Sequence, residues 1–164
     1  PHLLNIEEFY FAGGEPLLTD KHYEILNYLL EHGRTDVRIR YNTNMSVLKY
    51  KDQNVIDLWK HFPTIFVGAS LDSWGDRAEY IRDGSTWSNI EKNIKEIQNK
   101  CPHVNLQIST VVSVFNIYTL PDFYEYLIQK ELFEPNVDIS LYCIQNPDIY
   151  TFSVLSDTFK NKIY

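Results

Sequence analysis

The stretch FYFAGGEPLL, residues 9–18, decides how the chain leaves its first strand. Strand-forming aromatic residues run into two adjacent glycines, and a glutamate and a proline follow. Glycine has no Cβ, so Gly13 and Gly14 allow the backbone to turn sharply and to lie close to a ligand. Glu15 then places a carboxylate where it can meet a cationic group, and Pro16 restricts the exit from the turn. Taken alone, the four residues fit a ligand-binding loop and a tight turn with a solvated glutamate equally well.

The composition is that of an ordinary soluble, globular protein. Of 164 residues, 44% are hydrophobic and 15% aromatic, which argues against disorder. No apolar run approaches the roughly 20 residues that span a bilayer, and no signal peptide is visible, so we expect a cytoplasmic protein without a membrane partner. The formal net charge of -7 weighs against a nucleic-acid partner. Cys101 and Cys143 lie far apart, lack metal-ligand spacing, and are interpreted as reduced structural thiols.

Strand and helix patterns alternate along the chain, which is typical of a parallel α/β fold. Ser88 and Glu91 predict a capping box at the start of one helix. The strand at 65–71 is apolar almost throughout, which is typical of a strand covered on both faces. Such a fold is either an open doubly wound sheet or part of a barrel, and periodicity leaves both open. The five predicted strands span residues 6–12, 37–43, 65–71, 104–112 and 137–142.

In either architecture, ligands bind where the strands end. Thr43 and Asn44 lie at the end of the second strand and predict either polar ligand contacts or a helix cap or Asx turn. Ser70 and Asp72 lie at the end of the third strand, two residues apart and so on the same face. Arg82, further along, predicts either a bidentate pair with a ligand carboxylate or an ion pair with Glu79 or Asp83. Residues 113–116 after the fourth strand predict either an adenine-packing surface or ordinary core.

Two stretches occur in the order and at the spacing of motifs in the radical S-adenosylmethionine (SAM) family, and they make residues 6–142 resemble that family. The first is the glycine-glycine-glutamate-proline run at 13–16, and the second extends from the Ser-Leu-Asp at 70–72 through YIRDG at 80–84 to residue 94. The second stretch looks like members with SPASM or twitch extensions, many of which modify peptides. Thr43 and Asn44 match the family's second-strand pair, although Met45 stands where glycine is common.

The resemblance implies a partial (β/α)6 barrel that binds SAM beside a [4Fe–4S] cluster and forms a 5′-deoxyadenosyl radical. It implies that residues 1–143 are a partial core domain and that 144–164 are a trailing segment. Residues 113–116 would line the adenine pocket, and the substrate would be a peptide or a small molecule, with a reductant for the cluster. The residues implied to bind SAM are Gly13, Gly14, Glu15, Pro16, Thr43, Asn44, Ser70, Asp72 and Arg82.

The family's Cys-x3-Cys-x2-Cys run is not among these residues. Thiolates are needed to ligate the irons, so we expect this stretch alone to be inactive, and the cluster to occur only in a longer protein. The family's first strand, which precedes the cysteines, is also not among these residues. The strand at 6–12 would therefore be an exposed edge of the sheet, which predicts pairing with a second copy. Two alternatives stay open: a non-catalytic α/β module that binds a nucleotide or SAM, and a degenerate scaffold that binds a protein.

Overall fold

The computed structural model describes residues 5–161, and one parallel sheet organises them. All four strand pairings are parallel, and the five strands lie side by side in the order β1-β2-β5-β6-β7. This confirms the predicted α/β class with five parallel strands. The strands are β1 Glu8–Phe11, β2 Arg38–Thr43, β5 Ile65–Ser70, β6 Asn105–Val112 and β7 Ile139–Cys143.

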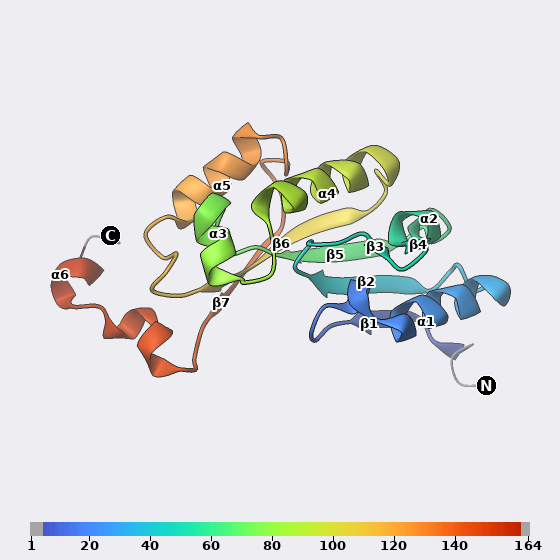
Figure 1. The fold of residues 1–164 in the computed structure, drawn as a ribbon, viewed down its shortest axis with the longest axis horizontal. Coiled ribbons are helices and arrows are strands. Elements are labelled where there is room, and N and C mark those ends of the chain that lie inside the picture. The colour runs from blue at the N-terminus through green and yellow to red at the C-terminus, as the bar shows by residue number, and fades with distance from the viewer. Residues whose placement is uncertain (1–4, 162–164) are drawn as a thin grey trace.

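Helices connect the strands, as Figure 1 shows. A short 3₁₀ helix at Pro16–Leu18 precedes α1, and a small hairpin of β3 and β4 precedes α2. The hairpin and α3 are elements that the sequence patterns did not predict. The helices and the hairpin strands are α1 Asp20–Glu31, β3 Lys49–Tyr50, β4 Gln53–Asn54, α2 Val55–Trp59, α3 Gly75–Ile81, α4 Trp87–Lys100 and α5 Leu120–Gln129.

The strand order decides between the two architectures left open by the sequence. Each new sheet strand is added beside the previous one, always on the same side. A doubly wound sheet reverses this order at a switch point, which is where its helices change faces. Right-handed crossovers without a reversal keep all helices on one face, as in a barrel. The five strands therefore form a segment of a (β/α) barrel wall.

The two faces of the sheet differ accordingly. Residues on the helix side are buried, for example Tyr41 and Val67, which pair across β2 and β5. The opposite face carries no helix in the described part of the chain, and Phe66 and Ser70 of the central strand are only half-buried there. The expectation that this strand is covered on both faces was therefore wrong. Its apolar sequence reflects the core on one side and small residues, such as Gly68, on the other.

The start of α4 differs from the predicted capping box. The helix begins at Trp87, whose N–H donates to Oε1 of Glu79 over 2.8 Å. Glu91 instead accepts a hydrogen bond of 2.5 Å from the Tyr126 hydroxyl of α5. A carboxylate from α3 thus satisfies the free N–H at the helix start, and tertiary contacts override the local pattern.

Both edges of the described sheet are open to pairing. β1 pairs only with β2, and β7 pairs only with β6. All five residues of β7 are exposed, among them Leu141 at 55% and Tyr142 at 56%. After β7 the chain runs away from the sheet in short helical turns and ends in α6, Asp157–Lys160 (Figure 1). Within residues 5–161 no helix is long and apolar enough to cross a membrane.

Candidate functional site

The glycine turn after β1 adopts the strained backbone that its sequence predicts. Gly13 has a φ of 85° and Gly14 a φ of 56°, values that favour glycine over residues with a Cβ. A Cβ at either position would meet no atom within 4 Å, so backbone conformation and not crowding selects glycine here. Both glycines are exposed at the carboxyl end of the sheet. Their peptide groups are therefore accessible to a ligand.

Glu15 ties this turn to the end of β2. Its Oε1 accepts hydrogen bonds from the Leu17 N–H at 3.1 Å and from the Thr43 hydroxyl at 2.7 Å. Its Oε2 accepts a hydrogen bond of 2.8 Å from the Asn44 N–H. A carboxylate oxygen has two lone pairs, so Oε2 keeps the capacity to accept from a cation. The structure thus brings together Glu15, Thr43 and Asn44, which lie 28 or 29 positions apart in the sequence.

Met45 completes this loop in a conformation that glycine would adopt more easily. Its φ is 61°, and its side chain is fully buried. The Met45 N–H donates to the Thr43 hydroxyl at 3.1 Å, and its carbonyl accepts a bond of 2.8 Å from the Asn93 amide. The loop keeps the left-handed turn, and the buried thioether chain offsets the strain of placing a side chain there.

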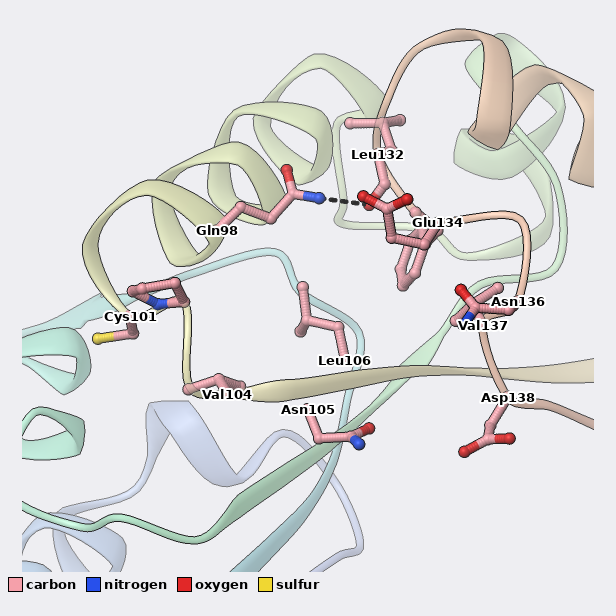
Figure 2. Close-up of a pocket in the computed structure, with 12 residues that line it drawn as sticks. Gln98, Cys101, Val104, Asn105, Leu106, Leu132, Glu134, Asn136, Val137 and Asp138 are labelled. Carbon is pink, nitrogen blue, oxygen red and sulfur yellow. Dashed lines mark hydrogen bonds between the residues drawn. The ribbon is translucent and has the colours of Figure 1, made fainter.

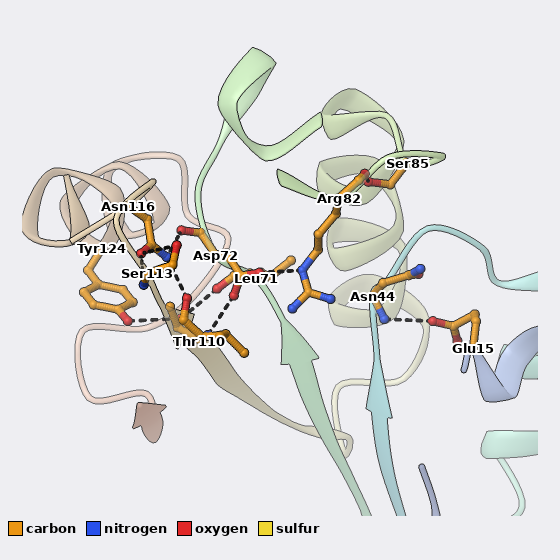
Figure 3. A network of polar contacts seen from close by, with 11 residues as sticks. Glu15, Asn44, Leu71, Asp72, Arg82, Ser85, Thr110, Ser113, Asn116 and Tyr124 are labelled. Carbon is orange, nitrogen blue, oxygen red and sulfur yellow. Dashed lines mark hydrogen bonds and ion pairs between the residues drawn. The ribbon is translucent and has the colours of Figure 1, made fainter. Parts of the chain in front are cut away.

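Asp72 and Arg82 form an ion pair just beyond β5. The Nε of Arg82 donates to Oδ2 of Asp72 at 2.7 Å, and Oδ1 accepts a bond of 2.7 Å from the Val111 N–H. Figure 3 shows the Arg82 guanidinium on the side of Asp72 that faces Asn44 and Glu15. Asp72 is 6% exposed and Arg82 33%, so the guanidinium is the accessible member of the pair. Asp72 thereby orients Arg82 toward the glutamate loop.

A second set of hydrogen bonds fixes the backbone around this pair. The amide nitrogen of Asn116 donates to the carbonyl oxygens of Asp72 and Val111, each at 2.9 Å. Its amide oxygen accepts from the Ser113 N–H at 2.8 Å. Residues 113–116 therefore form a turn that joins the ends of β5 and β6 (Figure 3).

Ser70 lies apart from these networks. It is the last residue of β5, on the helix-free face, and it is half-buried. Among the described residues its hydroxyl has no hydrogen-bond partner. The hydroxyl is available to a ligand that lies across the strand ends.

A cleft of about 450 Å³ opens beside the ion pair. Phe115 lies at its wall, with its ring 5.8 Å from that of Tyr80 and 5.2 Å from that of Tyr150. The volume of the cleft falls in the range of small-molecule sites, and such sites typically have aromatic walls with a few polar groups. Tyr80 and Tyr150 were not predicted, because no local pattern connects them to the strand ends. The lining residues are Asp72, Tyr80, Ile81, Arg82, Val111, Ser113, Phe115, Ile144 and Tyr150.

A cavity of about 490 Å³ lies at the opposite edge of the sheet. Figure 2 shows it between the end of α4, with Gln98, and the loop before β7, with Leu132 and Glu134. It opens at the amino ends of the strands, whereas ligands of parallel α/β proteins bind at the carboxyl ends. The smaller cleft, which touches Asp72 and Arg82, is therefore the better candidate.

The described residues do not fit an iron–sulfur cluster. Cys101 directly follows α4 and is buried, and Cys143 is exposed on β7. Within residues 5–161, no three His, Cys, Asp or Glu side chains lie together as a ligand set. Clusters of this kind are held by several thiolates, so the described residues alone would not bind one.

Comparison with known proteins identifies the family of this chain. A sequence model of the radical SAM superfamily matches residues 2–127. The chain belongs to the radical SAM superfamily. A search of curated proteins finds no match.

Solved structures share the radical SAM fold. The native protein anSMEcpe with bound AdoMet and a Kp18Cys peptide is 17% identical, with a TM-score of 0.64 over 95% of this chain and 44% of that one. SuiB of Streptococcus suis bound to S-adenosylmethionine is 14% identical, with a TM-score of 0.52 over 84% of this chain and 38% of that one. At these identities the likeness shows the fold alone. The chain spans less than half the length of either structure.

Proposed function

We propose that the carboxyl edge of this sheet binds S-adenosylmethionine and that the protein to which it belongs is a radical SAM enzyme. The observation that carries the proposal is the facing arrangement of two charged groups. The Glu15 carboxylate is held at the end of β2, and the Arg82 guanidinium is held by Asp72 at the end of β5 (Figure 3). The amino acid part of SAM carries one ammonium and one carboxylate. The ammonium is opposite in charge to Glu15, and the carboxylate is opposite in charge to Arg82.

The other residues have roles that follow from their positions. The Gly13 and Gly14 carbonyls and Glu15 hold the ammonium, and Pro16 and Thr43 keep Glu15 in place. Asn44 contributes the N–H that orients the same carboxylate. Asp72 positions Arg82, Ser70 faces the ribose, and the Phe115 side of the cleft accepts the adenine ring. These residues bind and orient, while the bound cofactor supplies the radical chemistry of the family.

Several finer assignments belong to the same proposal. The substrate is a peptide or a small molecule, and support for the peptide comes from a relative of this fold whose structure contains a bound peptide. The described residues offer no ligand set for a [4Fe–4S] cluster, so a cluster would have to be held elsewhere in a longer cytoplasmic protein, where it would pass an electron from a reductant to SAM. The 164 residues alone are then inactive in reductive cleavage. The SPASM or twitch assignment and the division at residue 143 stay predictions.

Calorimetry with SAM and 5′-methylthioadenosine tests the proposal. Methylthioadenosine has the adenosine part but lacks the ammonium and the carboxylate. We expect Glu15→Gln to weaken SAM binding at least tenfold, because a charge-assisted bond contributes about 1.5–3 kcal/mol, and to leave methylthioadenosine binding unchanged. The matched control is Glu24→Gln on the exposed face of α1, which should change neither affinity.

Two results would contradict the SAM site. One is an equal affinity for SAM in the wild type and in Glu15→Gln, with native circular dichroism in both. The other is a parallel loss of both ligands in a variant with native circular dichroism, which would show that Glu15 does not act on the ammonium.

Two observations keep other functions in view. The described residues lack a cluster ligand set, which favours a non-catalytic SAM-binding module. Anaerobic reconstitution of the longer protein and an assay for 5′-deoxyadenosine separate that module from an enzyme. The exposed edges formed by β1 and β7 favour pairing with another copy, which light scattering of the eluted peak measures.

A further inference from the structure

The helix-free face of the sheet carries a row of uncharged polar side chains. Asn42 pairs in register with Gly68, and Ser109 pairs with Ser70 and Ser140 on either side. Asn42 and Ser109 are both half-buried. Within the described part of the chain, neither side chain forms a hydrogen bond. Their full hydrogen-bonding capacity is therefore available to a molecule that lies on this face.

Gly68 brings the two side chains together. A Cβ built on Gly68 would lie 2.6 Å from Oδ1 of Asn42 and 3.1 Å from Oγ of Ser109. Gly68 does not have a positive φ, so its backbone does not require glycine. Glycine is needed here because it has no side chain, so the Asn42 amide can lie over β5 within reach of the β6 serine. We call Asn42, Gly68 and Ser109 the floor triad.

The cations of β2 on the same face are separated from the floor triad, and the carboxylate of Asp138 accepts a hydrogen bond of 3.3 Å from the Gln107 amide beside Gly68. Arg40 lies two residues before Asn42 on β2, about 7 Å nearer the amino end of the strand. Nη1 of Arg40 is 3.8 Å from Oε1 of Glu8, and Nη1 of Arg38 is 3.0 Å from Oε2 of the same glutamate. The carboxylate of Glu8 partly neutralises the charges of both arginines. The site proposed for SAM lies in the other direction, at the carboxyl ends of the strands.

We propose that the floor triad binds a secondary amide of the substrate, which makes a peptide its substrate class. A carboxamide and a hydroxyl each offer a donor and an acceptor, and a peptide unit offers one of each in return. A neutral partner also enters this half-buried row without the desolvation cost of an ion. The inference rests on the function proposed above, since it places the substrate beside the SAM site.

Nuclear magnetic resonance titration with N-acetylglycine N-methylamide tests the floor triad in the full 164-residue chain without SAM. We expect saturable shifts of the Asn42 side-chain amide and of the Gly68 and Ser109 backbone amides. Asn42→Ala and Gly68→Ala should each weaken this binding at least fivefold, the latter because its methyl group displaces the Asn42 amide. The control Asn27→Ala, which removes an amide on α1 bonded to Gln53, should leave the affinity unchanged.

Three outcomes would overturn the inference. One is a set of shifts that lies away from the floor triad, and another is an unchanged affinity in Asn42→Ala. The third is an equal response to acetate, which would assign the face to anions through Arg40. Because SAM is absent, failure of SAM binding in calorimetry leaves this result intact. A chain that binds SAM but not the amide overturns the floor triad alone.

Discussion

Arg82 reaches back ten residues to Asp72, and its Nε donates to Oδ2 of that buried carboxylate over 2.7 Å. The Val111 N–H holds the other oxygen at 2.7 Å, so the carboxylate cannot rotate without breaking a bond to β6. The pair thus connects the end of β5, the end of β6 and the C-terminal end of α3. The orientation of the guanidinium depends on all three elements.

Asp72→Asn should destabilise the fold by about 2–3 kcal/mol, less than the 3–5 kcal/mol for a fully buried pair because Arg82 is one-third exposed. The Asn amide has no charge to pair with Arg82, and when its oxygen accepts from the Val111 N–H, its NH2 group faces the guanidinium. Urea unfolding measures the loss. The control Asp57→Asn breaks an exposed ion pair with Lys60 and should leave the midpoint unchanged. An equal midpoint for Asp72→Asn and the wild type would contradict a structural role for the pair.

Met45→Gly and Glu131→Gly should have opposite effects on stability, although the φ angles of the two residues, 61° and 55°, are similar. Glycine relieves about 1–2 kcal/mol of backbone strain at either position. Met45 is buried, and deleting such a side chain costs about 2–5 kcal/mol, so a net loss of about 2 kcal/mol is expected. Glu131 is exposed, so its replacement should raise the melting temperature. Stabilisation by Met45→Gly would show that its burial contributes little.

His22 should make the fold less stable in acid. It is buried between α1 and β2, where its Nε2 lies 2.8 Å from the Tyr41 hydroxyl. Burial lowers the pKa of His22 from 6.5 to about 4. Between these values the unfolded chain binds a proton that the folded chain does not, so stability falls as pH falls from 6.5 to about 4. The full effect is about 3 kcal/mol.

Denaturant unfolding at pH 7 and pH 4.5 measures this effect. His22→Gln keeps an acceptor for the Tyr41 hydroxyl but does not titrate, so it should lose less stability between the two pH values than the wild type does. The same pH dependence in both proteins would assign the effect to other groups.

The two cysteines should react at very different rates. Cys101 is 1% exposed, its thiol donates to the Ile56 carbonyl at 3.6 Å, and burial raises its pKa. Cys143 is exposed on β7. Because the thiolate is the reactive form, Ellman's reagent should modify one thiol in the folded protein and two in denaturant. Fast modification of two thiols without denaturant would contradict the burial of Cys101, and Cys143→Ser should abolish the native reaction.

The local sequence determined the strands of the main sheet and the glycine turn. The two glycines with φ above 50° and the five strands follow from short-range preferences, which act within a few residues of each position. Polar residues at strand ends were also predictable, because parallel strands end at one edge. The capping box at Ser88 failed because Glu79, from another helix, supplies the cap.

Only the tertiary structure decided what joins these pieces. The strand order, which makes the sheet a barrel wall, depends on how the crossovers place one strand beside another. Sequence periodicity describes each segment separately and says nothing about this placement. The choice of Asp72 as the partner of Arg82, in place of a nearer acid, depends on how α3 folds back over β5. The role of Gly68 appears only when Asn42 and Ser109 lie across it, because a missing methyl group matters only where neighbouring strands would otherwise meet it.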